Sequence, residues 1–110
     1  MSGIRIIAEI AGTGLCAEKG DGVVFECAAS LNKGSEVHRR RAERAVLGAR
    51  RLIAGMEAAL AGMREGGYRK VRISPHLAYG AEGIEGKVPP NAVLVYEVWL
   101  TTVEKRDSGA

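Results

Sequence analysis

The residue with the clearest potential for ligand chemistry is Tyr79, which opens the stretch YGAEGIEGKVPPNA at residues 79–92. A tyrosine beside glycines in a loop can present its hydroxyl to a ligand as a hydrogen-bond donor or acceptor. The stretch joins two expected strands, although two neighbouring strands need only a two-residue turn. Loops of this length in compact domains are usually functional or disordered. We therefore interpret the stretch as a candidate site.

The cysteines and histidines give little support for metal or nucleophilic chemistry. Cys16 and Cys27 lack the spacing of a metal-binding pair, so we expect free thiols. The simplest interpretation of Cys27 is a small buried hydrophobic residue. His38 and His76 do not stand at metal-ligand spacing, and His38, beside three arginines, is expected at the surface. The sequence therefore predicts no metal site and no cofactor.

The segments around these residues predict an α+β domain. Short runs rich in β-branched residues predict strands at residues 4–10, 23–29, 68–74 and 93–103. Apolar residues at helical spacing predict a helix at residues 52–63, with Gly66 and Gly67 ending it. The part before Gly48 is open between a helix and a short strand at residues 45–47. Short connections favour a mostly antiparallel sheet with the helix packed on one face.

The composition is that of a soluble globular domain. The chain has 110 residues, of which 46% are apolar and 26% charged, and its net charge is +3. No apolar run approaches the roughly 18 residues of a membrane span, and we predict no membrane contact. The N-terminal residues lack the pattern of a secretory signal. We expect a monomeric cytoplasmic protein with one domain at residues 1–104 and a flexible tail at residues 105–110.

Three stretches of the sequence each contain a distinctive pattern of residues, and the spacing between them is distinctive as well. They are LIAGMEAALAGMREGGYRKVRISP at 52–75, AYGAEG at 78–83 and VPPNAVLVYEVWL at 88–100. Together with the looser fit of KGDGVVFECAASLNKGSEV at 19–37, they resemble the FKBP-type peptidyl-prolyl isomerases. The resemblance implies an antiparallel half-barrel wrapped around one short helix, with an apolar pocket between the two. It also implies a short strand at residues 45–47, ahead of the helix.

The resemblance further implies a peptidyl-prolyl isomerase that acts on X-Pro bonds of peptides or proteins and could assist protein folding. The catalytic groups would be the Tyr79 hydroxyl, which donates to a substrate carbonyl, and the backbone N–H of Ile53 at the start of the helix. The implied substrate-binding residues are Cys27, Val37, His38, Leu52, Met56, Val88 and Tyr96. Without the family, the apolar residues of the helix and Tyr96 would be interpreted as ordinary core.

Four of these positions depart from the family pattern. Met56 stands where the family usually has Trp, Cys27 where it has Tyr, Val37 where it has Phe, and His38 where it has Asp. Because aromatic side chains dominate such contacts, we expect a wider pocket and weaker ligand binding. The alternative hypothesis is a non-catalytic module of the same fold that binds proline-containing or acidic protein segments.

The arginine-rich segment at residues 37–51 is not explained by the resemblance. A solvated basic face is its simplest interpretation. Arg39, Arg40 and Arg41 are expected at the rim of the pocket, where they could bind an acidic partner or acidic residues near the substrate proline. No aromatic residue is interleaved with the arginines, so nucleic-acid binding is disfavoured.

Overall fold

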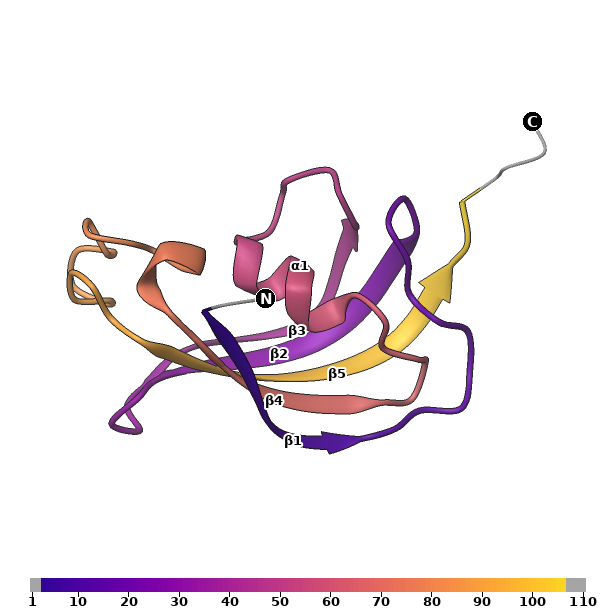
Figure 1. Ribbon diagram of the computed structural model, residues 1–110, viewed down its shortest axis with the longest axis horizontal. Helices are drawn as coiled ribbons and strands as arrows, with labels where there is room; N and C mark the ends of the chain where they lie inside the picture. Colours follow the sequence, from indigo (N-terminus) through magenta and orange to yellow (C-terminus); the bar gives the residue numbers. More distant parts are fainter. Residues whose placement is uncertain (1–2, 107–110) are drawn as a thin grey trace.

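All five strands lie in one curved antiparallel sheet, seen in a computed structural model that describes residues 3–106. The elements in chain order are β1 (Ile4–Ile10), β2 (Gly22–Leu31), β3 (Glu36–Val46), α1 (Ala54–Leu60), β4 (Tyr68–Ile73), the 3-10 turn η1 (Pro75–Leu77) and β5 (Leu94–Glu104). The strand order across the sheet is β1-β4-β5-β2-β3. Figure 1 shows α1 lying over the hollow side of this sheet. The predicted α+β class, an antiparallel half-barrel around one short helix, is confirmed.

The core lies between α1 and the middle of the sheet. Side chains alternate along β5, so that Leu94, Tyr96, Val98 and Leu100 are buried. The helix covers them closely because Gly55 has no side chain. A Cβ at that position would lie 2.5 Å from the side chain of Ile73 on β4. A glycine inside a helix costs about 1 kcal/mol, and here it permits close packing of helix on sheet.

The helix is shorter than the sequence predicts. Ile53 precedes it in an extended conformation, with ψ at 152°, and Ala61 leaves the helical conformation with ψ at 126°. The guanidinium of Arg69 on β4 donates to the carbonyls of Ala59 and Ala61, at 2.9 and 3.1 Å. It thereby satisfies carbonyls at the helix end that have no partner within the helix. The prediction that Gly66 and Gly67 end the helix is wrong, because the helix ends six residues earlier, at Leu60.

Residues 37–46 of the arginine-rich segment lie in a strand and not in a helix. β3 has eleven residues and pairs with β2 alone, so it forms one edge of the sheet. The implied short strand at residues 45–47 therefore overlaps only the last two residues of a longer strand, which ends at Val46. Two register shifts interrupt the pairing, and Ala42 adopts a left-handed φ of 47°. Charged side chains and bulges are common devices on edge strands because they hinder pairing with other chains, and they also conceal the alternation that identifies a strand.

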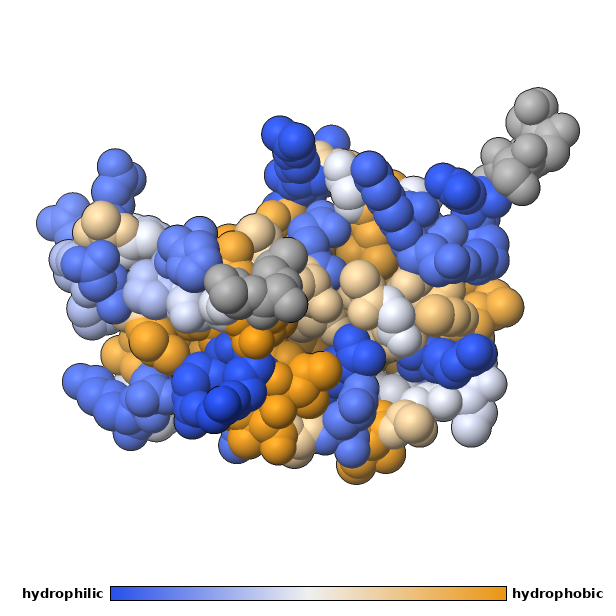
Figure 2. Space-filling model, in the orientation of Figure 1, coloured by the Kyte–Doolittle hydropathy of each residue, from blue (hydrophilic) through white to orange (hydrophobic). Residues whose placement is uncertain are grey.

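The opposite edge of the sheet is more apolar. On β1, the side chains of Ile6, Ile7 and Ile10 are 48%, 43% and 66% exposed. Figure 2 shows apolar residues gathered where Figure 1 draws this strand. Within residues 3–106, no helix combines the length and the hydropathy needed to cross a membrane.

The last described residues of the chain are anchored to the start of β2. Lys105 donates from Nζ to the buried carboxylate of Asp21 at 2.5 Å and to Glu18 at 2.9 Å, and the backbone N–H of Arg106 donates to Asp21 at 3.1 Å. The hydrogen bond from Lys105 lowers the pKa of Asp21 to about 2. Residues 105 and 106 of the expected tail are thus held in place, and residues 107–110 lie outside the described residues.

Candidate functional site

A cavity of about 340 Å³ opens between the hollow face of the sheet and the start of α1. Its walls come from β2, β3, β5, the segment before α1, the helix itself and the loop after η1. Ligand pockets in proteins usually measure about 300–1,000 Å³, so this cavity is large enough for part of a peptide. It brings together seven of the nine predicted site residues: Cys27, His38, Leu52, Ile53, Met56, Tyr79 and Tyr96.

Tyr79 enters the cavity from the loop of residues 79–92, which we call the flap. The flap is held by its own backbone bonds, since Gly83 N–H donates to the Tyr79 carbonyl at 3.0 Å and Asn91 N–H to the Gly80 carbonyl at 2.9 Å. Gly83 has φ at +65°, and a Cβ there would collide with the carbonyl oxygen of Val88. The flap is therefore a tightly folded loop that fixes the position of the tyrosine.

Ile53 contributes a backbone donor at the start of the helix. Its carbonyl accepts from the N–H groups of Met56 and Glu57, at 3.0 and 3.2 Å. Its own N–H has no hydrogen-bond partner among residues 3–106. The first turn of a helix leaves such donors unpaired. Because Ile53 lines the cavity, this N–H is available to a carbonyl bound there.

Two further polar side chains connect to Tyr79. Its hydroxyl lies 3.4 Å from the Tyr96 hydroxyl, which in turn lies 3.3 Å from Nε2 of His38. The rings of His38 and Tyr96 meet edge to face, with centroids 5.8 Å apart. Burial raises the pKa of Tyr96 far above its usual range, so this residue keeps its proton. The expectation that His38 lies at the surface is wrong, because it is half-buried and lines the cavity.

The floor of the cavity is apolar and sulfur-rich. Met56 is 3% exposed and comes from α1, while Phe25 and Cys27 come from the inner face of β2. Burial raises the pKa of the Cys27 thiol, which therefore stays protonated. Cys27 and Cys16 are both free, as the sequence predicts. The floor formed by Met56, Phe25 and Cys27 suits an apolar ring. Phe25 is the one aromatic side chain among these three residues.

The charged rim of the cavity is narrower than the sequence suggests. Arg40 lines it and forms an exposed ion pair with Glu43 at 3.6 Å. Arg39 lies on the other face of the sheet, where it pairs with Glu26 at 3.2 Å and stands 5.9 Å from the ring centre of Trp99. Arg41 does not line the cavity. Of the three expected rim arginines, the structure places Arg40 alone at the cavity.

Val37 and Val88 lie outside the lining of the cavity. Val37 is half-buried at the start of β3, beside the core. Val88 is 3% exposed and exchanges two backbone hydrogen bonds with Ile84, each 2.8 Å long. Its side chain packs in the core beneath the flap, so it supports the loop that carries Tyr79.

Sequence reasoning did not assign Phe25, Glu43 and Arg51 to the site, although all three line the cavity. Phe25 shares a strand face with Cys27, and period-two alternation could have identified it. Glu43 could not be placed in this way, because the bulge near Ala42 changes the face on which later residues of β3 lie. Arg51 lies in the irregular segment between β3 and α1, where no alternation of faces applies.

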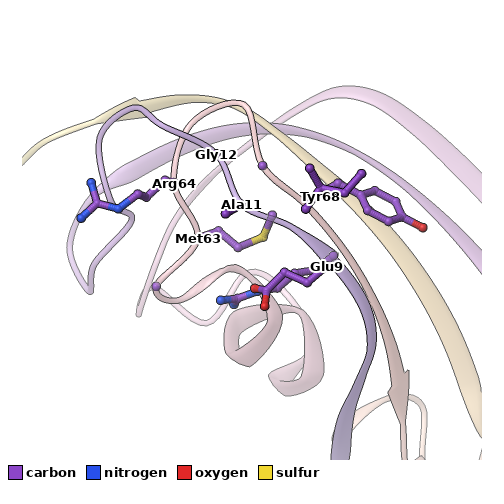
Figure 3. A pocket seen from close by; sticks show the side chains of 10 residues that line it. Glu9, Ala11, Gly12, Met63, Arg64 and Tyr68 are labelled. Carbon is purple, nitrogen blue, oxygen red and sulfur yellow. The ribbon is translucent and has the colours of Figure 1, made fainter.

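A second hollow, of about 180 Å³, lies where β1 ends beside the segment that follows α1. Figure 3 shows Glu9, Ala11, Gly12, Met63 and Arg64 around it, with the ring of Tyr68 directed away. The Tyr68 hydroxyl instead donates to Glu97 at 2.6 Å. Arg69 also borders the hollow, and its guanidinium is engaged by Glu9 at 2.5 Å and by the helix end. These polar groups serve the fold, and the hollow is smaller than an ordinary ligand pocket.

The comparisons with known proteins agree with this geometry. Residues 15–101 match the family model described as FKBP-type peptidyl-prolyl cis-trans isomerase. The chain is 36% identical over 107 residues to an FK506-binding protein of Neisseria meningitidis serogroup B, an alignment that covers 94% of this chain and 98% of that protein.

Longer eukaryotic relatives match over part of their length. The chain is 41% identical over 86 residues to the human peptidyl-prolyl cis-trans isomerase FKBP7, covering 77% of this chain and 36% of that protein. It is 32% identical over 105 residues to a 39 kDa FK506-binding nuclear protein of Drosophila melanogaster, covering 92% of this chain and 29% of that protein. The chain thus spans about a third of the length of these two relatives. By its family match and its fold, the chain belongs to the FKBP-type peptidyl-prolyl cis-trans isomerases.

Proposed function

We propose that this protein catalyses cis-trans isomerisation of X-Pro peptide bonds in the cavity beneath the flap. The observation that carries the proposal is the meeting, at one apolar-floored cavity, of the Tyr79 hydroxyl and an Ile53 N–H that has no partner within residues 3–106. Both groups can hold carbonyls of a bound peptide. The names of the relatives, several of which are peptidyl-prolyl cis-trans isomerases, support the same reaction.

The reaction needs neither a nucleophile nor a metal. Rotation about a peptide bond is opposed by a barrier of about 18–20 kcal/mol that arises from C–N resonance. The cis and trans forms of an X-Pro bond differ by only about 0.5–1 kcal/mol, and they exchange slowly without a catalyst. An enzyme must therefore bind the twisted amide better than either planar form. The twisted amide has lost resonance, so its carbonyl is less polar and is better suited to an apolar cavity than to water.

Each part of the cavity has a role in this account. Met56, Phe25 and Cys27 surround the proline ring and exclude water from the amide. The Ile53 N–H and the Tyr79 hydroxyl hold carbonyls on either side of the rotating bond, which fixes one end of the peptide while the other turns. Isomerisation of this kind could assist the folding of client proteins that contain proline.

The charged rim of the cavity supports a preference of the protein for substrates or partners that carry acidic residues close to the proline. Arg40 stands at the cavity, where it could attract a substrate or partner carboxylate. Arg39 is occupied on the other face by Glu26, so we assign the preference to Arg40 and Arg51, the two arginines of the segment that line the cavity, and test it first at Arg40.

A non-catalytic module that binds proline-containing segments is the second candidate. It is favoured by the floor of the cavity, where Met56 and Cys27 replace the aromatic side chains usual in the family. With less aromatic surface the cavity would hold a proline more loosely, and it could bind a peptide without stabilising its twisted form.

The test is the rate of cis-trans exchange of an Ala-Leu-Pro-Phe peptide in the presence of the purified protein. We expect the rate to rise in proportion to protein concentration. Ile53→Asp, which places a charge at the cavity, should abolish the acceleration. Ile7→Asp is the matched control, because Ile7 is 43% exposed on β1 and does not line the cavity. A wild-type rate equal to that of buffer would refute catalysis.

A further inference from the structure

His38, Tyr96 and Tyr79 form a row of polar groups that leads from β3 into the cavity. The Tyr96 hydroxyl stands between the other two, 3.3 Å from His38 Nε2 and 3.4 Å from the Tyr79 hydroxyl. A hydroxyl has one proton to donate and accepts at its lone pairs. Because Tyr96 is 2% exposed and stays protonated, its single proton must be directed either to His38 or to Tyr79.

The other ring nitrogen of His38 indicates which direction is favoured. Nδ1 is buried and has no hydrogen-bond partner among residues 3–106. A buried N–H without an acceptor is rarer in proteins than an acceptor without a donor. The favoured tautomer therefore leaves Nδ1 bare and carries the proton on Nε2, which is the atom next to Tyr96.

With that tautomer the order of donors along the row is fixed. Nε2–H of His38 donates to the oxygen of Tyr96, and Tyr96 donates its proton to the oxygen of Tyr79. The proton of Tyr79 is then not needed within the row and is left for a bound carbonyl. With the opposite tautomer, Tyr96 would donate to His38, and its oxygen would compete with the substrate for the proton of Tyr79.

We propose that His38 is a positioning residue which, through Tyr96, keeps the hydroxyl proton of Tyr79 directed toward the substrate carbonyl. His38 itself need not touch the substrate. The inference rests on the proposed function in one respect only, namely that Tyr79 binds a substrate carbonyl.

The charged groups around His38 are consistent with a neutral ring. Burial lowers the pKa of His38 below its usual range, and the positive charges of Arg40 and Lys87 act in the same direction. Glu43 and Glu36 oppose them with smaller effects. Near neutral pH the ring is therefore uncharged and carries one proton, which the unpaired Nδ1 assigns to Nε2.

The decisive experiment compares two isosteric replacements, His38→Gln and His38→Glu. A glutamine amide can donate to Tyr96 as Nε2 does, whereas an ionised glutamate only accepts. We expect kcat/KM for the Ala-Leu-Pro-Phe peptide to be about fivefold lower for His38→Glu than for His38→Gln, which is the effect of about one net hydrogen bond. Both variants are then repeated with Tyr96→Phe, which removes the central hydroxyl.

In the Tyr96→Phe background the ratio of kcat/KM between His38→Gln and His38→Glu should fall to about one, because the row of hydrogen bonds is interrupted. A ratio that remained unchanged would mean that the glutamate acts by its charge alone, and it would overturn the inference. Wild-type protein that did not accelerate exchange at all would instead refute the proposed function.

A second measurement does not depend on activity or on the folding of variants. The ¹⁵N chemical shifts of the His38 ring distinguish a protonated from a bare nitrogen. We expect Nε2 to be protonated and Nδ1 bare in the wild-type protein near neutral pH. Protonation at Nδ1 with a bare Nε2 would overturn the inference even if the enzyme proved active.

Discussion

The flap and strand β3 both border the cavity, but they are held in different ways. The flap is closed by backbone bonds between its own residues, such as Gly83 to Tyr79 and Val88 to Ile84, and its valine packs in the core. β3 is an edge strand with one neighbour, two register shifts and an exposed ion pair between Arg40 and Glu43. One border is fixed by main-chain hydrogen bonds, and the other is formed by the side chains of an edge strand.

This contrast separates two tasks within one cavity. The flap and Ile53 supply the groups that would bind carbonyls in any X-Pro peptide. β3 supplies His38 and Arg40, whose polarity and charge would adjust how those groups act and which peptides are preferred. Changes on the flap should therefore affect every substrate, and changes on β3 should affect substrates unequally.

Among changes on the flap and β3, the largest effect is expected from Gly83→Ala. Alanine there would be strained by the left-handed φ of +65° and would also collide with the Val88 carbonyl. Because displacement of a binding group by about 1 Å can cost about 100-fold in rate, we expect a loss of that order in kcat/KM. Gly86→Ala is the matched control, since its φ is +78° but nothing lies within 4 Å of its Cβ. Equal kcat/KM values for the two variants would show that activity does not depend on a rigidly held flap.

A smaller effect is expected from Tyr79→Phe. The change removes one hydroxyl and leaves the ring, so the fold should persist. We expect kcat/KM to fall about fivefold, and by a similar factor for peptides with Leu, Glu or Lys before proline, because the carbonyl is common to all of them. A loss confined to one peptide would place Tyr79 among the specificity residues instead.

Arg40→Ala should change the order of substrates more than the overall rate. Exposed ion pairs contribute about 0.2–1 kcal/mol. We therefore expect a preference for Glu over Leu before proline to decline by at most about fivefold, and to decline in the wild type as salt is raised. Arg39→Ala, on the opposite face of the sheet, is the control and should keep the preference. If both arginines had the same effect, a diffuse basic surface would be the better explanation.

The smallest effect on the cavity is expected from Asp21→Asn, at the start of β2. The pKa of Asp21 is lowered in the folded protein from 3.8 to about 2. Its stabilising contribution is therefore present above about pH 4 and is lost as the pH falls toward about 2. Urea denaturation should show a deficit for Asp21→Asn near neutral pH that shrinks toward pH 2, while kcat/KM of the folded variant stays unchanged. A deficit of the same size at every pH would contradict this linkage.

Most of the cavity could be predicted from the sequence, including His38 on β3, whereas the extent of β3 and the place of Val88 beneath the flap could not. Ile53, Met56 and Tyr79 stand in stretches whose spacing is distinctive, and the structure gathers them around one cavity. β3 was ambiguous because apolar residues such as Ala42, Ala45 and Val46 also recur at helical spacing, and because the irregular backbone at Ala42 breaks the alternation of faces.

Some features depend on tertiary structure that local sequence does not encode. The carbonyls at the end of the helix, which stops at Leu60, accept from Arg69 on a later strand. The partnership of His38 with Tyr96 joins β3 to β5, two strands that are separated by β2 in the sheet. Neither contact could be expected from residue type or spacing alone.

The most direct test of the central claim is NMR exchange spectroscopy on one proline peptide, because it reports binding and isomerisation in the same sample. With catalytic amounts of wild-type protein, we predict cis-trans exchange of Ala-Leu-Pro-Phe that quickens in proportion to protein concentration and returns to the buffer rate with Ile53→Asp. Shifts of cavity resonances on binding, without any acceleration of exchange, would contradict catalysis and identify the protein as a proline-binding module.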